Sequence, residues 1–180
     1  MTGGVEKLVY RDANWDDLDA LAALHVRVWR DTYRLLAPTA AYEALDEAKR
    51  RQHWDELLRR DPSTWRTMVA EYNGRLVGLG HAGTGTHEVM AGAGEIVHLY
   101  VDPEMQGRGI GSSLLLELRR FLMASGHPVV RLAVVEGNSQ ALRFYERAGG
   151  RIVGDFVDGV LWRSHNHIVE FPSIAMGVPL

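Results

Sequence analysis

Residues 95–121 constrain the fold more than any other stretch, because they combine the patterns of a strand, a glycine-rich turn and a helix in direct succession. The segment 95–101 is rich in branched and aromatic side chains, which favour a strand. Asp102-Pro103 ends that strand, since proline has no N–H to donate to a neighbouring strand. After the turn, apolar residues recur at helical spacing from Leu114 to Leu122. The first N–H groups of such a helix have no partner inside it and lie at the positive end of its dipole, so the turn is suited to hold a phosphate.

The turn itself reads Gln106-Gly-Arg-Gly-Ile-Gly-Ser112. Its glycines allow the backbone to approach an anion closely, and Arg108 can add a charge-assisted hydrogen bond. The turn lacks the lysine of a Walker loop, and its glycines alternate instead of following the dinucleotide-binding pattern. We therefore interpret residues 106–112 as a pyrophosphate-binding turn. A purely structural turn, or a site for another nucleotide, is the alternative.

Two motifs in this half of the chain resemble those of one protein family. The spacing Gln-x-x-Gly-x-Gly resembles the coenzyme A loop of the GNAT superfamily of N-acetyltransferases. Downstream, Asn138–Gly149 is similar to the GNAT pattern Asn-x-x-Ala-x-x-Phe-Tyr-x-x-x-Gly. The sequence departs from the pattern at Gly150, where the family usually has a bulky residue, often phenylalanine. The resemblance covers residues 95–149 specifically and the rest of the chain only in the order of its elements.

The resemblance implies that acetyl-CoA is the cofactor and that it lies where two parallel strands, residues 95–101 and 129–135, splay apart. In the family the asparagine of the second motif contacts the cofactor, and the tyrosine lies near its sulfur. A bulge in the first strand exposes backbone N–H groups in the family. The predicted cofactor-binding residues are therefore Leu99, Tyr100, Val101, Gln106, Gly107, Arg108, Gly109, Ile110, Gly111, Ser112, Asn138 and Tyr145.

The implied reaction is transfer of an acetyl group to a primary amine by direct attack. An amine with a pKa near ~10.4 is protonated at neutral pH, so a base must remove a proton first. A glutamate at the start of the strand does this in GNAT histone acetyltransferases, and Glu95 stands at the same offset, eleven residues before Gln106. His98 and water are competing bases, and strand alternation puts Glu95 and His98 on opposite faces unless a bulge intervenes. Tyr145 is the predicted acid that protonates the leaving thiolate, with core packing as its alternative role.

The acceptor site is less well specified by the sequence. Trp29 and Tyr33 lie one helical turn apart, and they either pack in the core or form an aromatic wall for the acceptor. The resemblance favours the wall, because GNAT proteins build their acceptor site largely from the first helical region. The acceptor can be a polyamine, an amino acid, an antibiotic amine, or the N-terminus or a lysine of a protein. Trp162 is a weakly supported candidate for a homodimer contact.

Composition narrows the function further. A chain of 180 residues with 46% hydrophobic content suits one domain with a sizeable core. The net charge of −3 gives no general attraction to nucleic acid or to an anionic membrane. There is no cysteine, and the histidines do not follow a zinc-ligand spacing, so we expect no metal site. No secretory signal or membrane-spanning run is visible, so a cytoplasmic enzyme is expected. A non-catalytic sensor that binds acetyl-CoA is the alternative function.

The expected fold is a single α/β domain, residues 1–180, with a mixed and strongly twisted sheet and helices on both faces. Asn73-Gly74 predicts a two-residue hairpin turn. Residues 83–94 are rich in glycine and predict a loop. Besides the two parallel strands, strands are predicted at residues 7–10, 65–72, 75–82, 151–156 and 160–171.

Overall fold

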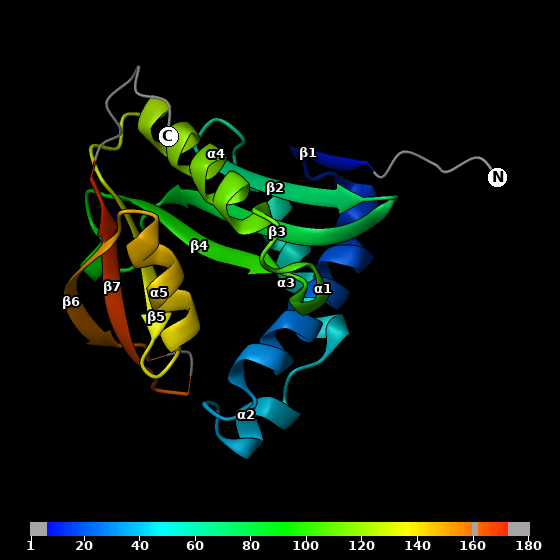
Figure 1. Cartoon of the computed structure of the whole chain (residues 1–180), viewed down its shortest axis with the longest axis horizontal. Coiled ribbons are helices and arrows are strands. Elements are labelled where there is room, and N and C mark those ends of the chain that lie inside the picture. The colour runs from blue at the N-terminus through cyan, green and yellow to red at the C-terminus, as the bar shows by residue number, and fades with distance from the viewer. Residues whose placement is uncertain (1–6, 160–161, 173–180) are drawn as a thin grey trace.

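The computed structural model describes residues 7–159 and 162–172 of the chain. These residues form a seven-stranded mixed sheet in the order β1-β2-β3-β4-β5-β7-β6 (Figure 1). Every neighbouring pair is antiparallel except β4 and β5, which are parallel. The strands are β1 Leu8–Asp12, β2 Trp65–Tyr72, β3 Arg75–Thr84, β4 Gly94–Val101, β5 Val130–Val135, β6 Arg151–Val157 and β7 His165–Phe171.

Helices cover both faces of the sheet, which confirms the predicted fold class. Helices α1 and α3 cover one face of the first four strands, and α4 and α5 lie on the other face (Figure 1). Among the described residues, no helix is both long enough and apolar enough to span a bilayer. The helices are α1 Leu18–Tyr33, α2 Thr39–Glu43, α3 Glu47–Leu58, α4 Ile110–Ala124 and α5 Ser139–Arg147, with short 3₁₀ turns η1 Trp15–Asp17, η2 Glu88–Met90 and η3 Pro103–Met105.

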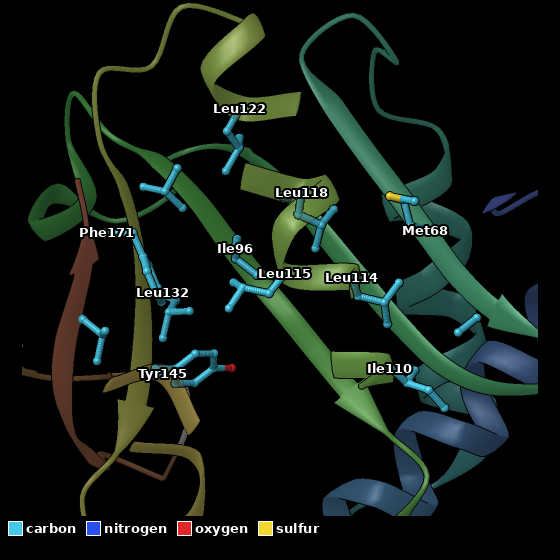
Figure 2. Packing of buried hydrophobic residues seen from close by; sticks show 14 of the residues in the cluster. Met68, Ile96, Ile110, Leu114, Leu115, Leu118, Leu122, Leu132, Tyr145 and Phe171 are labelled. Carbon is cyan, nitrogen blue, oxygen red and sulfur yellow. The ribbon is translucent and has the colours of Figure 1, made fainter. Parts of the chain in front are cut away.

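The larger part of the core lies between α4 and the sheet. Leu114, Leu118 and Leu122 are fully buried on one side of α4 and face the strands (Figure 2). A glycine in β3 makes this close approach possible, because a Cβ at Gly80 would lie 2.5 Å from the Leu118 side chain. A smaller cluster lies under α1 and α3, where Trp54 has no exposed surface. Apolar burial of this kind contributes about 1.5–3 kcal/mol for each fully buried large side chain.

Several local expectations need correction. Residues 83–94 are not all loop, because β3 continues to Thr84 and η2 follows. The last strand begins at His165 and not at residue 160; Trp162 has a positive φ, and residues 160–161 lie outside the described part. Arg119 of α4 is buried although arginine is a charged residue, and its guanidinium lies 4.6 Å from the centroid of the Phe171 ring. The Asn73-Gly74 turn has positive φ at both residues, as the sequence predicts.

The departure from the family pattern at Gly150 has a packing explanation. A Cβ at Gly150 would lie 2.7 Å from Val169 and 2.9 Å from Phe171, both on β7. Phe171 is fully buried and belongs to the main core cluster. An aromatic side chain supplied by β7 therefore takes the space next to residue 150.

Strands β4 and β5 diverge soon after they meet. Their pairing is limited to Gly94 with Val130 and Glu95 with Arg131, so the edge of β4 beyond Glu95 has no strand partner on that side (Figure 1). The pairing of β4 with β3 is also irregular, because Ile96 and His98 face consecutive residues of β3 and Val97 is bulged out. The bulge therefore lies ahead of residues 99–101, and the splay of the strands leaves those residues open toward β5.

Candidate active site

A cavity of about 600 Å³ occupies the space where β4 and β5 diverge. It runs from the N-terminus of α4, past the first turns of α5, to the C-terminal half of α1. A volume of this size is typical of small-molecule and cofactor sites. All the predicted cofactor-binding residues line the cavity except Arg108, which is exposed. The hydrogen bond from Arg108 to the phosphate stays a prediction.

The turn before α4 has the geometry of an anion cradle. Gly109 is the N-cap of α4 and has a φ of +78°, a conformation that favours glycine. A Cβ on Gly109 or on Gly107 would have no atom within 4 Å, so the space beside the backbone is open at both glycines. Gly111 differs, because a Cβ there would lie 3.3 Å from Phe144 of α5. The free N–H groups at this helix end can hold a pyrophosphate, which fits the implied cofactor.

Buried polar contacts hold the cradle in place. Asp102 is 1% exposed, and its carboxylate accepts hydrogen bonds from Arg27 at 2.6 Å and from the backbone N–H of Glu104 at 3.1 Å. Because Arg27 belongs to α1, this ion pair ties the end of β4 to the helix on the opposite face. On the exposed side, the Gln140 amide of α5 donates to the Gln106 side chain at 2.8 Å.

Helix α5 brings Asn138 and Tyr145 to the cavity. The Asn138 side chain caps the helix by accepting from the backbone N–H of Ala141 at 3.2 Å. Tyr145 is 8% exposed, and its ring packs edge-on against Phe171. Its hydroxyl points toward β4 (Figure 2). Burial raises the pKa of Tyr145 well above its ordinary value, so the phenol stays protonated at neutral pH.

Glu95 lies at the start of β4 but not on the cavity wall. It is 5% exposed, and one carboxylate oxygen accepts from the Thr86 N–H at 2.6 Å and from the Thr86 hydroxyl at 2.8 Å. Residue 86 belongs to the segment expected to be a loop, so no sequence pattern indicated this contact. Any exchange of protons between Glu95 and the cavity needs an intervening water.

Helix α1 builds the part of the cavity where the acceptor was predicted to bind. Tyr33 lines it, together with Val28, Asp31 and Thr32, which share one face of the helix. Burial raises the pKa of Tyr33 to about 12. Trp29 is 4% exposed and does not line the cavity; it packs behind Tyr33 with the ring centroids 5.0 Å apart.

Trp162 completes this aromatic group within the same chain. Its ring centroid lies 5.6 Å from those of Trp29 and Tyr33. Trp162 therefore has an intramolecular packing role, and a dimer contact through it stays a prediction. Sequence reasoning missed Asp31, although its helical spacing from Val28 places the two on one face.

Four histidines gather on the α1 and α3 side of β4, and sequence reasoning did not bring them together. His98 Nε2 lies 3.1 Å from His53 Nε2, and the His25 ring centroid lies 5.1 Å from that of His98. His81 is fully buried and makes a 2.8 Å hydrogen bond to the Thr67 hydroxyl. In the described part of the chain, no group of three or more His, Asp or Glu side chains is arranged to hold a metal ion.

The bulge at Val97 decides which residues of β4 share a face. Ile96 and Leu99 pack toward α4, whereas His98 and Tyr100 pack toward α1 and α3. Because one extra residue is inserted, Glu95 and His98 lie on the same face of the sheet. Opposite faces were expected only for a regular strand, and the bulge is the exception that the sequence analysis allowed for.

Comparison with known proteins agrees with this geometry. Residues 29–150 match the sequence model of the family described as "Acetyltransferase (GNAT) family". A protein of Archaeoglobus fulgidus described as an uncharacterized N-acetyltransferase is 35% identical over 137 residues, which cover 75% of this chain and 87% of that protein.

Solved structures of similar fold cover nearly the whole chain. The PaiA N-acetyltransferase of Thermoplasma acidophilum, solved in complex with coenzyme A, has a TM-score of 0.77 at 24% identity, covering 93% of this chain and 99% of that one. The ribosomal-protein-alanine N-acetyltransferase of Brucella melitensis has a TM-score of 0.70 at 24% identity, with coverages of 92% and 99%. At this identity the likeness shows the fold alone. The family match spans more than half of the sequence and a relative exceeds 30% identity, so the chain belongs to the acetyltransferase (GNAT) family.

Proposed function

We propose that this protein transfers the acetyl group of acetyl-CoA to the primary amine of an acceptor molecule. The observation that carries the proposal is a single cavity that joins the anion cradle at Gly109 to the α1 residues around Tyr33, with Tyr145 between them. A cavity with a phosphate-binding end, a protonated phenol on its wall and a separate second end suits a reaction between two bound molecules.

The cofactor end is formed by the cradle and by the open edge of β4. Backbone N–H groups around Gly109 and Gly111 would hold the pyrophosphate. Arg147 is the only basic residue on the described cavity wall, and it adds positive charge near α5. Acetyl-CoA supplies the activated acetyl group as a thioester when bound. Residues 99–101 offer backbone groups along the unpaired edge of β4 for the remainder of the cofactor.

Two side chains are proposed to move protons. Tyr145 donates its hydroxyl proton to the departing sulfur, because its buried phenol is protonated at neutral pH and faces the cavity. Glu95 takes a proton from the acceptor nitrogen through a water, since its carboxylate is held by Thr86 away from the wall. Attack is direct, with no cysteine in the chain to form a thioester intermediate.

The acceptor end favours a cationic amine. Asp31 is the only carboxylate among the described residues that line the cavity, and it is exposed at the α1 end. An exposed carboxylate attracts an incoming ammonium group, and Tyr33 provides an aromatic surface beside it. Trp29 and Trp162 keep the Tyr33 ring in place from behind.

The proposal is tested by release of free thiol from acetyl-CoA in the presence of single amines. A suitable panel contains spermidine, L-lysine, an aminoglycoside and a peptide with a free N-terminal alanine. We expect thiol release with at least one amine, and a mass increase of that amine by one acetyl group. Binding of acetyl-CoA by calorimetry without thiol release from any amine would favour the non-catalytic sensor instead.

A further inference from the structure

Arg147 is a cavity residue for which the protein itself supplies no counter-charge. It belongs to the last turn of α5, is exposed, and makes no ion pair with another described residue. No other basic side chain lies on the described cavity wall. A lone cation at this place favours an anionic group of the molecule that the cavity binds. The role of Arg147 developed below rests on acetyl-CoA binding, the cofactor half of the proposed function, and does not depend on the acceptor.

Coenzyme A carries phosphate at two separate places. The pyrophosphate joins the pantetheine arm to the nucleoside, and a further phosphate is esterified to the 3′-hydroxyl of the ribose. A phosphate monoester of this kind carries about 1.5 to 2 negative charges near neutral pH. The backbone N–H groups of the cradle before α4 suit the pyrophosphate. The 3′-phosphate is therefore left for water or for a separate cation.

One row of side chains on α5 relates Arg147 to the cradle. Gln140, Phe144 and Arg147 all line the cavity, and residues three and four apart lie on one side of a helix. The first two contact the turn before α4, because Gln140 bonds to Gln106 and Phe144 lies beside Gly111. Arg147 is the next side chain of the row, about 4.5 Å further along the helix axis than Phe144. It therefore lies just beyond the pyrophosphate-binding turn.

The reactive end of the cofactor is assigned to the opposite edge of the same helix face. Tyr145, proposed to protonate the cofactor sulfur, points its hydroxyl toward β4 (Figure 2). At about 100° for each residue of an α-helix, Tyr145 and Arg147 are about 160° apart around the axis of α5. A cofactor that reaches from Tyr145 to the cradle therefore has its nucleoside on the side where Arg147 lies.

From this arrangement we propose that Arg147 binds the ribose 3′-phosphate of coenzyme A and makes the protein prefer coenzyme A to dephospho-coenzyme A. A guanidinium group offers two parallel N–H groups, which match two oxygens of one phosphate. The two ligands share the pantetheine arm and the pyrophosphate, so the difference between their affinities reports the 3′-phosphate alone. The net charge of −3 gives the chain no general attraction for anions that would replace this contact.

The test measures the binding of coenzyme A and of dephospho-coenzyme A by calorimetry, which needs neither an acceptor nor turnover. We expect the parent protein to bind coenzyme A about tenfold more tightly, as suits an exposed but charge-assisted contact. Arg147→Met keeps an unbranched side chain and removes the charge. This variant should bind coenzyme A about as weakly as the dephospho form, whose own affinity should change by less than about twofold. Arg147→Lys should keep part of the preference, because lysine retains the charge but not the paired N–H groups.

Arg143→Met is the matched control. Arg143 is exposed on the same helix, one turn before Arg147, and does not line the cavity. Its replacement should leave both affinities unchanged, which separates a local contact from a general loss of positive charge. Arg108→Met tests the cradle instead. Because Arg108 is predicted to contact the pyrophosphate, this variant should weaken both ligands by the same factor.

The preference of the parent protein for coenzyme A should shrink as the salt concentration rises, because exposed charges are screened. Equal weakening of both ligands by Arg147→Met would place its contact at the pyrophosphate and overturn the proposal. Unchanged binding of both ligands would overturn it as well, since Arg147 would then contact neither phosphate group. Failure of the parent protein to bind either ligand would refute the cofactor half of the proposed function instead.

Discussion

Mild acid should destabilise this protein through its buried histidines. His25 is 1% exposed and His81 is fully buried, and burial lowers the pKa of each from 6.5 to about 3. In the unfolded chain both rings take up a proton near pH 6.5, whereas in the folded chain they stay neutral. Because the unfolded state binds more protons between these values, stability rises with pH across the window and is lost as pH falls below 6.5.

The size of the effect follows from the two pKa values. Well below pH 6.5, each such histidine removes about 1.4 kcal/mol of folding free energy for every pH unit. Between pH 7 and pH 5.5 the loss is about 1.3 kcal/mol for each ring and about 2.5 kcal/mol for the two. The pKa of His98 is lowered in the same direction and adds to the loss. Since domains are stable by only about 5–15 kcal/mol, a loss of this size lowers the urea midpoint visibly.

The assay is urea unfolding followed by circular dichroism at several values of pH between 7.5 and 5. The unfolded state of His81→Asn takes up one proton fewer than that of the parent. Between pH 7 and pH 5.5 the stability of this variant should therefore fall by about 1.3 kcal/mol less than that of the parent. His87→Asn is the control, because His87 is exposed and should leave the slope unchanged. A parent stability that is flat between pH 7 and pH 5.5 would refute the reasoning.

The remaining predictions concern the cavity. Gly109→Asp should abolish acetyl-CoA binding in calorimetry while the fold survives, because it places negative charge at the cradle; Gly74→Asp, with a similar φ of +81° on a remote turn, should bind normally. Glu95→Gln should lower kcat by about 10²–10⁴ with nearly unchanged acetyl-CoA affinity, and unaltered kcat would remove Glu95 from the mechanism. Tyr145→Phe should keep its melting temperature and lose at least about 10-fold in kcat, with a smaller loss on a thioester of a more acidic thiol; equal losses would make the hydroxyl a positioning group.

Local sequence patterns predicted which residues line the cavity around the N-termini of α4 and α5, and their contact with the cofactor stays a prediction. The glycine turn at residues 106–112 and the motif of Asn138–Gly149 each combine backbone conformation and function within a few residues. Gly109 needs a positive φ at the start of a helix, and Asn138 caps the next helix, so both signals are local. A backbone conformation or a helix cap that depends only on residues close in sequence can be deduced without the tertiary structure.

The surroundings of Glu95, Tyr33 and His98 could not be predicted in the same way, because they depend on contacts between distant segments. Glu95 is held by Thr86 from a segment that looked like a loop. Trp29 and Tyr33 are both aromatic and lie one helical turn apart, so the sequence does not distinguish their roles. Only the fold shows that Tyr33 lines the cavity and that Trp29 packs behind it. The His53–His98 pair joins residues 45 positions apart on a helix and a strand. No periodicity in either element indicates that they meet.

The bulge at Val97 decides both which residues of β4 enter the apolar core and which histidine meets His53. In a regular strand that kept Ile96 against α4, His98 would also face α4 and Leu99 would face the histidine layer. An imidazole without a partner in the apolar α4 core would destabilise the fold by about 1–3 kcal/mol, and a leucine would lie among the buried histidines in its place. Because one residue is inserted, Leu99 packs in the core on the α4 side and His98 lies on the other face, where it contacts His53. The contact of His98 with His53 therefore depends on the same one-residue irregularity that keeps the α4-facing side of β4 apolar.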